Sequence, residues 1–447
     1  MVYFACLRAM ERQRLVDSYH EVKNAFLNTG ISWRTYGLIS CFALSSWITV
    51  NGIWSELPVI VLSAPEKWQI ASYTVVIIQL GFAGPLLFSL ANRLCPRIFN
   101  EKFTIYLLFI IGILSCLFLA LWYKETTMID GKAHSVVLMV LVFFLALVDC
   151  TSSVVFLTFM SFYDPRYITA LYIGESLCGL LPGVAAIIQG SPTCNHSNHT
   201  GQNSTSLHDG LLFSGSVYFI ILLLMMLISC VAFICLNTLS FAKKEQSSEV
   251  MVASALQEED TEDLIEEAHL GFCCDSSCLS SSQLLVFFFI QAIVSGFSFG
   301  ILPSLSPYSF EPYGGPSYHL VSSLGPILSS IVCFFTIWFK SKSQKTLFLV
   351  SFVFIAAATY QVILASESPT PLLYKSDAGA ILAVLSGLIT GMFGTYIRLT
   401  ISVIMREQSY RALYWCGMSI QIGSFIGAFS IFPFVSILHD FHGKKSC

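Results

Sequence analysis

Two tryptophans and an asparagine recur on one face of an apolar segment near the start of the chain. Trp47, Asn51 and Trp54 are spaced at i, i+4 and i+7, which places two indoles and an amide on one side of a helix. Indole rings offer stacking area to a planar solute, and a carboxamide can read an edge that carries carbonyl and N–H groups. The alternative is that the tryptophans form an interfacial aromatic belt and that Asn51 joins helices. Glu56 lies just beyond this face, and we expect it to belong to the same site.

Three ionisable residues, Asp149, Glu175 and Arg398, lie inside other apolar segments. A charged side chain near the centre of a membrane span costs roughly 2.5 to 3.5 kcal/mol on insertion scales, so such residues mark functional positions. Asp149 and Glu175 are candidates for proton coupling, with Arg398 as their counter-charge. Hydrogen bonding between helices is an equally favoured explanation for either carboxylate. The further polar residues that we expect in a binding pocket are Gln79, Ser152, Tyr318 and Gln421.

The composition requires a lipid environment for the elements that carry these residues. Of 447 residues, 55% are hydrophobic and 11% are charged, far from the balance of a soluble domain. Lys and Arg are scattered through short loops and form no basic patch, which excludes a nucleic-acid partner. The bilayer is therefore the main solvent of this chain.

Long apolar runs predict an all-α polytopic membrane protein with about eleven transmembrane helices. A polar stretch with an acidic run from Glu258 to Glu267 separates six runs from five. Two-bundle transporters use this 6+5 kind of layout, with the substrate site near the bilayer midplane between the bundles. We divide the chain into an N-terminal cytosolic extension, a first bundle, a cytosolic acidic linker and a second bundle, at 1–34, 35–242, 243–282 and 283–447. The predicted spans cover 36–56, 70–91, 103–123, 135–160, 167–190, 212–237, 283–303, 317–339, 346–365, 378–405 and 411–438.

The loops predict how the chain is oriented. Lys and Arg are concentrated in alternate loops, which places the N-terminus in the cytosol and the C-terminus outside the cell. The loop at 191–211, on the predicted outer side, contains glycosylation sequons at Asn195, Asn198 and Asn203. An unmodified polar loop is the alternative.

Motifs of other protein classes are missing from the sequence. There is no Walker loop, no H-E-x-x-H and no G-x-S-x-G, so we expect neither ATP-driven pumping nor an enzyme. Cys273, Cys274 and Cys278 lack a fourth ligand at zinc spacing, and we expect no metal and no cofactor.

Several segments resemble one family of membrane carriers. The run from Ser46 to Pro58, S-W-I-T-V-N-G-I-W-S-E-L-P, is similar to the first-span signature of the animal riboflavin transporter family, solute carrier family 52. The segments 146–154 (A-L-V-D-C-T-S-S-V) and 174–182 (G-E-S-L-C-G-L-L-P) resemble its fourth and fifth spans, and 411–433 resembles its last. The resemblance covers nearly all of the apolar portion. The chain departs from the family pattern at Ser298-Phe299-Gly300, where a Thr-Asn pair precedes the glycine in a relative.

The resemblance implies a function that the polar residues alone leave open. It implies uptake of riboflavin, vitamin B2, across the plasma membrane without sodium and with sensitivity to related flavins. We expect the mechanism to be alternating access between two bundles, and we expect uptake to be sensitive to pH. The residues alone also allow a carrier of another planar solute, such as a nucleoside, or a membrane receptor that does not transport.

Overall fold

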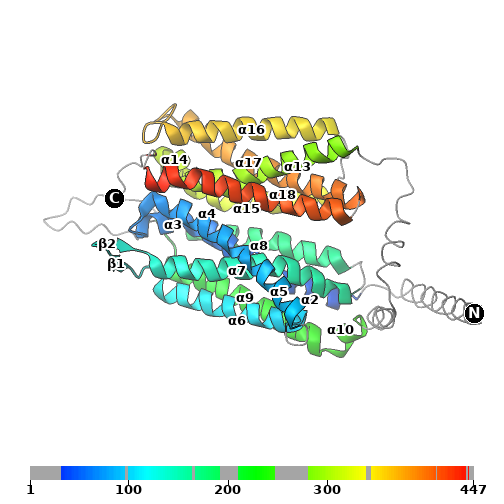
Figure 1. Cartoon of the computed structure of the whole chain (residues 1–447). Helices are drawn as coiled ribbons and strands as arrows, with labels where there is room; N and C mark the ends of the chain where they lie inside the picture. The colour runs from blue at the N-terminus through cyan, green and yellow to red at the C-terminus, as the bar shows by residue number, and fades with distance from the viewer. Residues whose placement is uncertain are drawn as a thin grey trace, which may run out of the picture.

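The computed structural model describes residues 32–95, 99–163, 167–191, 210–246, 280–338, 344–408, 410–438 and 441. Helices dominate these ranges, which confirms the prediction of an all-α membrane protein (Figure 1). The exception is a short antiparallel hairpin of β1 (Thr127–Ile129) and β2 (Lys132–His134), with Met128 opposite Ala133. We call the end of the helical bundle that carries this hairpin the hairpin end.

The first half of the chain follows most of its predicted spans. The first span differs, because it is a pair of helices, α2 (Trp33–Ala43) and α3 (Ile48–Ser63), that meet at an angle of 50°. At the break, the Ser45 hydroxyl donates to the Phe42 carbonyl at 3.0 Å, a local bond that competes with helix continuation. The other elements of this half are η1 (Lys67–Gln69), α4 (Ile70–Gly81), α5 (Ala83–Leu94), α6 (Glu101–Trp122), α7 (Val136–Phe159), η2 (Met160–Phe162), α8 (Ile168–Gln189), α9 (Gly215–Thr238) and α10 (Ser240–Lys244).

The second half opens with a capping box, in which Ser280 and Gln283 bond to one another's backbone at the start of its first helix. That helix continues through a short π-helix, a deviation from α geometry that is frequent at functional sites. The elements are α13 (Ser281–Gly296), the π-helix η4 (Phe297–Ile301), α14 (Leu302–Phe310), η5 (Glu311–Tyr313), α15 (Gly315–Trp338), α16 (Gln344–Ser366), α17 (Asp377–Gln408), α18 (Tyr410–Phe432) and the π-helix η6 (Pro433–Ile437).

Length and hydropathy identify the helices that can cross a membrane. Within the described residues nine helical stretches qualify, and the bent pair of α2 and α3 raises the number to ten. Helix α15 is not one of the nine, but at 24 residues it is also long enough to cross a membrane. The protein is thus a multi-pass membrane protein.

Glycines bring helices α13 and α18 into backbone contact. A Cβ atom added to Gly423 would lie 2.1 Å from the Ala292 carbonyl oxygen, and one added to Gly427 would lie 2.2 Å from the Gly296 carbonyl oxygen. Small residues at helix crossings are the usual route to close packing in a bilayer, where lipid removes the hydrophobic drive for association.

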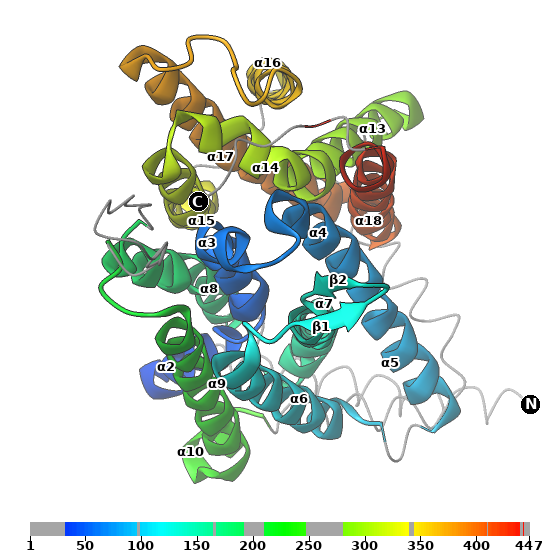
Figure 2. The same ribbon diagram turned by 90° about the vertical axis from the view of Figure 1, so that its left-hand side faces the viewer.

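The two halves lie side by side and contact one another along a few helices. In the end-on view of Figure 2, α13 to α18 occupy the upper part and α2 and α6 to α10 the lower part. Helices α3 and α8 of the first half pack against α15 of the second, and α4 packs against α14 and α18. This contact surface positions the candidate site.

Candidate functional site

A cavity of about 460 Å³ lies between the two halves. Its walls come from α3 and α8 on one side and from η4, α14, α15, α16 and α17 on the other. Cavities of this size enclose small organic molecules, and apolar walls with a few polar groups are typical of such sites. The prediction of a site between the halves agrees with this geometry.

The aromatic and amide face of α3 forms part of the wall. Trp47, Asn51 and Trp54 all line the cavity, as their spacing predicts. The Trp47 indole is fixed by a hydrogen bond from Nε1 to Ser153 Oγ at 2.7 Å. The Asn51 amide donates to Cys178 Sγ at 3.4 Å, and its Oδ1 accepts no hydrogen bond from the described residues. The face therefore presents ring surface together with an unused acceptor.

One carboxylate and one guanidinium face this cavity from opposite halves. Glu175 on α8 has Ser46 as its hydrogen-bonding neighbour, and Arg398 lies on α17. The guanidinium carbon of Arg398 lies 4.4 Å from the centroid of the Phe299 ring, within the range of a cation–π contact. In the part of the chain that the structure describes, no ion pair joins Arg398 to Glu175 or to another carboxylate.

Asp149 and Ser152 lie behind the cavity wall. Asp149 is fully buried and accepts hydrogen bonds from the Thr49 hydroxyl and the Val50 backbone N–H, both at 2.8 Å. Ser152 is equally buried and donates to the Ser46 carbonyl at 2.8 Å. Both residues hold the start of α3 in place, so their contact with the cavity is indirect.

The other predicted site residues are divided between the cavity and more distant positions. Tyr318 lines the cavity and accepts a hydrogen bond from Ser306 at 3.5 Å. Glu56 is buried inside the first half, where it accepts a bond from Gln189 at 3.0 Å. Gln79 donates to the Phe299 carbonyl at 3.3 Å and so joins α4 to η4 across the halves. Neither Glu56 nor Gln79 lines the cavity, and Gln421 on α18 does not line it either. A role of these three in substrate contact stays a prediction.

Most of the polar wall of the second half was not predicted from the sequence. This wall is rich in hydroxyl-bearing residues and glycines of α15 and α17. The signal that could have revealed it is the cluster of serines within the apolar segment 317–330. The residues concerned are Ser322, Gly325, Ser329, Ser330, Gly387, Thr390, Gly391 and Thr395.

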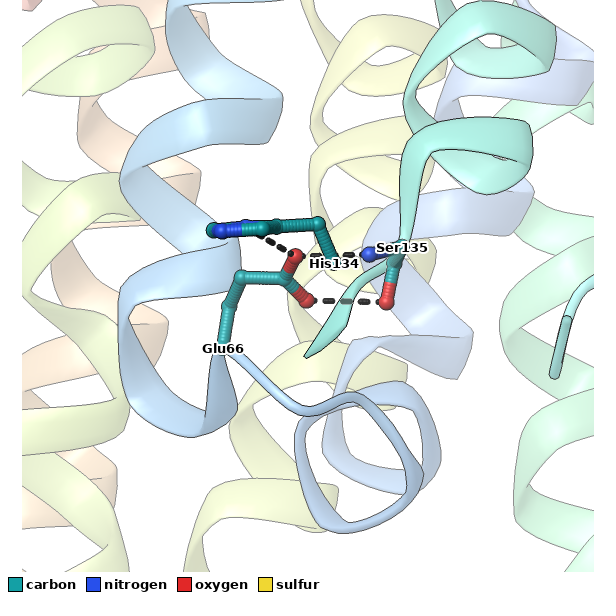
Figure 3. A network of polar contacts seen from close by, with 3 residues as sticks. All are labelled: Glu66, His134 and Ser135. Carbon is teal, nitrogen blue, oxygen red and sulfur yellow. Dashed lines mark hydrogen bonds and ion pairs between the residues drawn. The ribbon is translucent and has the colours of Figure 1, made fainter. Parts of the chain in front are cut away.

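A separate polar network fastens the loop after α3 to the start of α7 at the hairpin end (Figure 3). Glu66 accepts hydrogen bonds from the Ser135 backbone N–H at 2.7 Å and from the Ser135 hydroxyl at 2.8 Å. His134 Nδ1 lies 3.4 Å from the same carboxylate. Because Ser135 is the N-cap residue of α7, Glu66 supplies the side-chain cap that this helix lacks.

Hydrogen bonds join the two halves at this same end. Ser72 and Ser436 share a hydrogen bond of 2.7 Å, and His319 Nε2 lies 2.9 Å from the Ala186 carbonyl oxygen.

The sequons Asn195, Asn198 and Asn203, the acidic run from Glu258 to Glu267 and the cysteines Cys273, Cys274 and Cys278 lie outside the described residues.

Solved structures of several transporters share this fold. A point mutant of the nucleoside transporter NupG matches with a TM-score of 0.52 at 13% identity, covering 90% of this chain and 91% of that one. A D-xylose–proton symporter matches with a TM-score of 0.56 at 11% identity over 91% of this chain and 92% of that one. At such low identity the likeness concerns the fold alone.

The sequence comparisons are more specific. A family model described as solute carrier family 52, riboflavin transporter, matches residues 31–443. "Riboflavin transporter 2" of Salmo salar is 34% identical over 92% of this chain and 98% of its own length. The family 52 riboflavin transporter member 2 of Homo sapiens is 32% identical over 92% of this chain and 96% of its own. Since the match spans nearly the whole chain in both directions, this protein belongs to solute carrier family 52, the riboflavin transporter family.

Proposed function

We propose that this protein carries riboflavin into cells across the plasma membrane by alternating access and without sodium. The observation that carries the proposal is the cavity between the halves, where Trp47, Asn51 and Trp54 of the first half face a hydroxyl-rich wall of the second. Riboflavin combines a planar heterocycle with a polyhydroxyl chain. The tryptophans suit the ring, and the serines and threonines suit the chain.

The division of the cavity between two halves supports alternating access. A solute bound to both walls responds to any movement of one half against the other. At the hairpin end the halves are joined by contacts such as Ser72 to Ser436 and His319 to the Ala186 carbonyl, which are single hydrogen bonds and can separate at modest cost. Proton coupling through one of the two carboxylates, Asp149 or Glu175, belongs to this proposal, and we assign it to Glu175, because Glu175 and Arg398 line the cavity whereas Asp149 is held by Thr49 and Val50 behind its wall.

The orientation of the chain is part of the same proposal. The distribution of Lys and Arg supports a cytosolic N-terminus and an extracellular C-terminus, with the hairpin end outside the cell. Sequons on the same predicted side support glycosylation at Asn195, Asn198 and Asn203.

The experiment that tests the proposal is uptake of radiolabelled riboflavin by cells that express the wild type or Asn51→Ala. Asn51→Ala removes an amide from the cavity wall, and we expect uptake to fall at least tenfold at equal surface expression. Asn237→Ala is the matched control, because Asn237 lies on α9 and its amide bonds to the Phe233 carbonyl of its own helix. It should transport like the wild type.

Two outcomes would contradict the proposal. A wild type that reaches the surface without taking up riboflavin is not a riboflavin carrier in this setting. If unlabelled nucleosides compete for uptake better than unlabelled flavins do, the cavity serves a different planar solute.

A further inference from the structure

Arg398 is a charged side chain within the bundle whose hydrogen-bonding capacity is largely unused. A guanidinium carries five N–H donors. Among the described residues it makes one hydrogen bond, from Nη2 to Thr395 Oγ1 at 3.3 Å, and its Nη1 is buried without an acceptor. Unsatisfied charged donors in apolar surroundings cost free energy, which a ligand with acceptor atoms would recover.

Its neighbours hold the guanidinium in one orientation on the wall of the cavity. The Phe299 ring supports it at 4.4 Å, and Thr395, one turn earlier on α17, accepts from Nη2. All three residues line the cavity. A planar fork that is fixed in this way suits acceptor atoms at defined positions, whereas a lysine would act as a mobile point charge.

The charges around the cavity favour a ligand without net charge. Among the described residues that line it, Arg398 is the only cation and Glu175 the only carboxylate, and the two stand on opposite halves without pairing. An anion would be opposed by Glu175 and a cation by Arg398. An uncharged molecule with carbonyl oxygens satisfies the guanidinium and avoids both penalties.

We infer that Arg398 determines specificity by donating hydrogen bonds to the carbonyl oxygens of an uncharged planar ring whose faces lie against the tryptophans of α3. The inference rests on the proposed function, because the ring system of riboflavin carries two carbonyls on one edge. In this arrangement Arg398 of the second half binds the carbonyl edge. Trp47 and Trp54 of the first half bind the faces of the ring, whether or not it carries carbonyls.

The test compares two uncharged tricyclic probes in equilibrium binding to purified full-length protein. Lumiflavin carries both carbonyls and no polyhydroxyl chain, and phenazine has a tricyclic ring without carbonyls. We expect Arg398→Met to weaken lumiflavin binding about 10- to 100-fold, the range of a lost charged hydrogen bond, and to change phenazine binding less than about 3-fold. Arg398→Lys should restore only part of the lumiflavin affinity.

Two milder variants keep the test decisive if Arg398→Met does not fold. Thr395→Val removes the acceptor that orients the guanidinium and should weaken lumiflavin several-fold without affecting phenazine. Ser351→Ala is the control, because Ser351 on α16 does not line the cavity and its hydroxyl is bonded to the Leu347 carbonyl of its own helix at 2.8 Å. It should alter neither affinity.

The outcomes separate this inference from the proposed function. Equal loss of both probes in Thr395→Val and in folded Arg398→Met would show that Arg398 only maintains the shape of the cavity, and would overturn the inference. Wild-type protein that binds lumiflavin no better than phenazine would overturn it as well. If the Arg398 and Thr395 variants lose affinity for lumiflavin but not for phenazine, while the wild type does not take up riboflavin in cells, the inference is upheld and the proposed function is contradicted.

Discussion

Replacing Asp149 by asparagine should weaken the fold and leave the pH response of uptake unchanged, because Asp149 holds the first turn of α3. The Val50 N–H that it accepts belongs to the first turn, where a helix cannot satisfy its own donors. The N-cap residue of α3, Trp47, makes no side-chain cap. Asp149 supplies the missing cap from α7, with its carboxyl oxygens at the N-terminal end of α3.

The magnitude follows from the two donors that Asp149 satisfies. Asparagine keeps one carbonyl acceptor for either the Val50 N–H or the Thr49 hydroxyl and leaves the other donor buried without an acceptor, which should lower the free energy of unfolding by about 2 kcal/mol. Alanine leaves both donors buried without an acceptor, so Asp149→Ala should lower it by about 4 kcal/mol.

The assay is thermal unfolding of the purified variants, followed by tryptophan fluorescence, together with riboflavin uptake across a pH series at matched surface expression. Glu56→Gln is the control, because Glu56 is an equally buried carboxylate with one described hydrogen bond, from Gln189, which glutamine can still accept. Its unfolding temperature should stay near that of the wild type. A variant Asp149→Asn that unfolds like the wild type but loses the pH response would refute the capping argument and identify Asp149 as the titrating group.

Three shorter predictions concern other parts of the structure. Glu66→Ala should lower the free energy of unfolding by about 1 to 2 kcal/mol, because it uncaps α7 at Ser135, and thermal unfolding measures this. Gly427→Leu should abolish surface expression by driving α18 away from α13, whereas Gly417→Ala, where an added Cβ meets nothing within 4 Å, should express normally. Glu175→Gln should flatten the dependence of uptake on pH, since it removes the only carboxylate among the described cavity residues; an unaltered profile at normal expression would exclude proton coupling through Glu175.

The fold and one wall of the site were readable from the sequence for simple physical reasons. Apolar runs of bilayer length predict helices, and membership of a transporter family confirms that the chain is not an enzyme. The spacing of Trp47, Asn51 and Trp54 predicts a common face because side chains of one helix share a face by periodicity alone. Glu175 and Tyr318, expected in a binding pocket because they are polar groups inside apolar spans, line the same cavity, and their contact with the substrate stays a prediction.

The remaining assignments depended on packing that no single helix reveals. Asp149 and Glu175 look alike in sequence. The packing of α7 against α3 brings Asp149 to the start of α3, whereas Glu175 on α8 faces the cavity. The cavity wall of α15 was missed because a serine in an apolar span is a weak signal, although Ser322 and Ser329 are spaced to share one face of the helix. Contacts between elements distant in sequence decide such cases.

Ser298 offers a test of how the second half balances stability against function. It lies in η4 on the cavity wall, and its hydroxyl is buried without a partner among the described residues. Removing an unsatisfied buried hydroxyl relieves a cost of about 1 to 3 kcal/mol, so Ser298→Ala should raise the unfolding temperature. If the hydroxyl is instead kept for a bound solute, the same variant should lower riboflavin uptake, a trade-off typical of functional sites.

Ser304→Ala is the control for this prediction, because the Ser304 hydroxyl is already bonded to the Gly300 carbonyl at 2.9 Å and lies away from the cavity. It should change stability by less than about 1 kcal/mol and leave uptake intact. A lower unfolding temperature in Ser298→Ala would mean that its hydroxyl has a partner in the folded protein. Greater stability with undiminished uptake would mean that Ser298 does not touch the solute, and that other residues of this span on the cavity wall, such as Phe299 and Ser306, make its contacts.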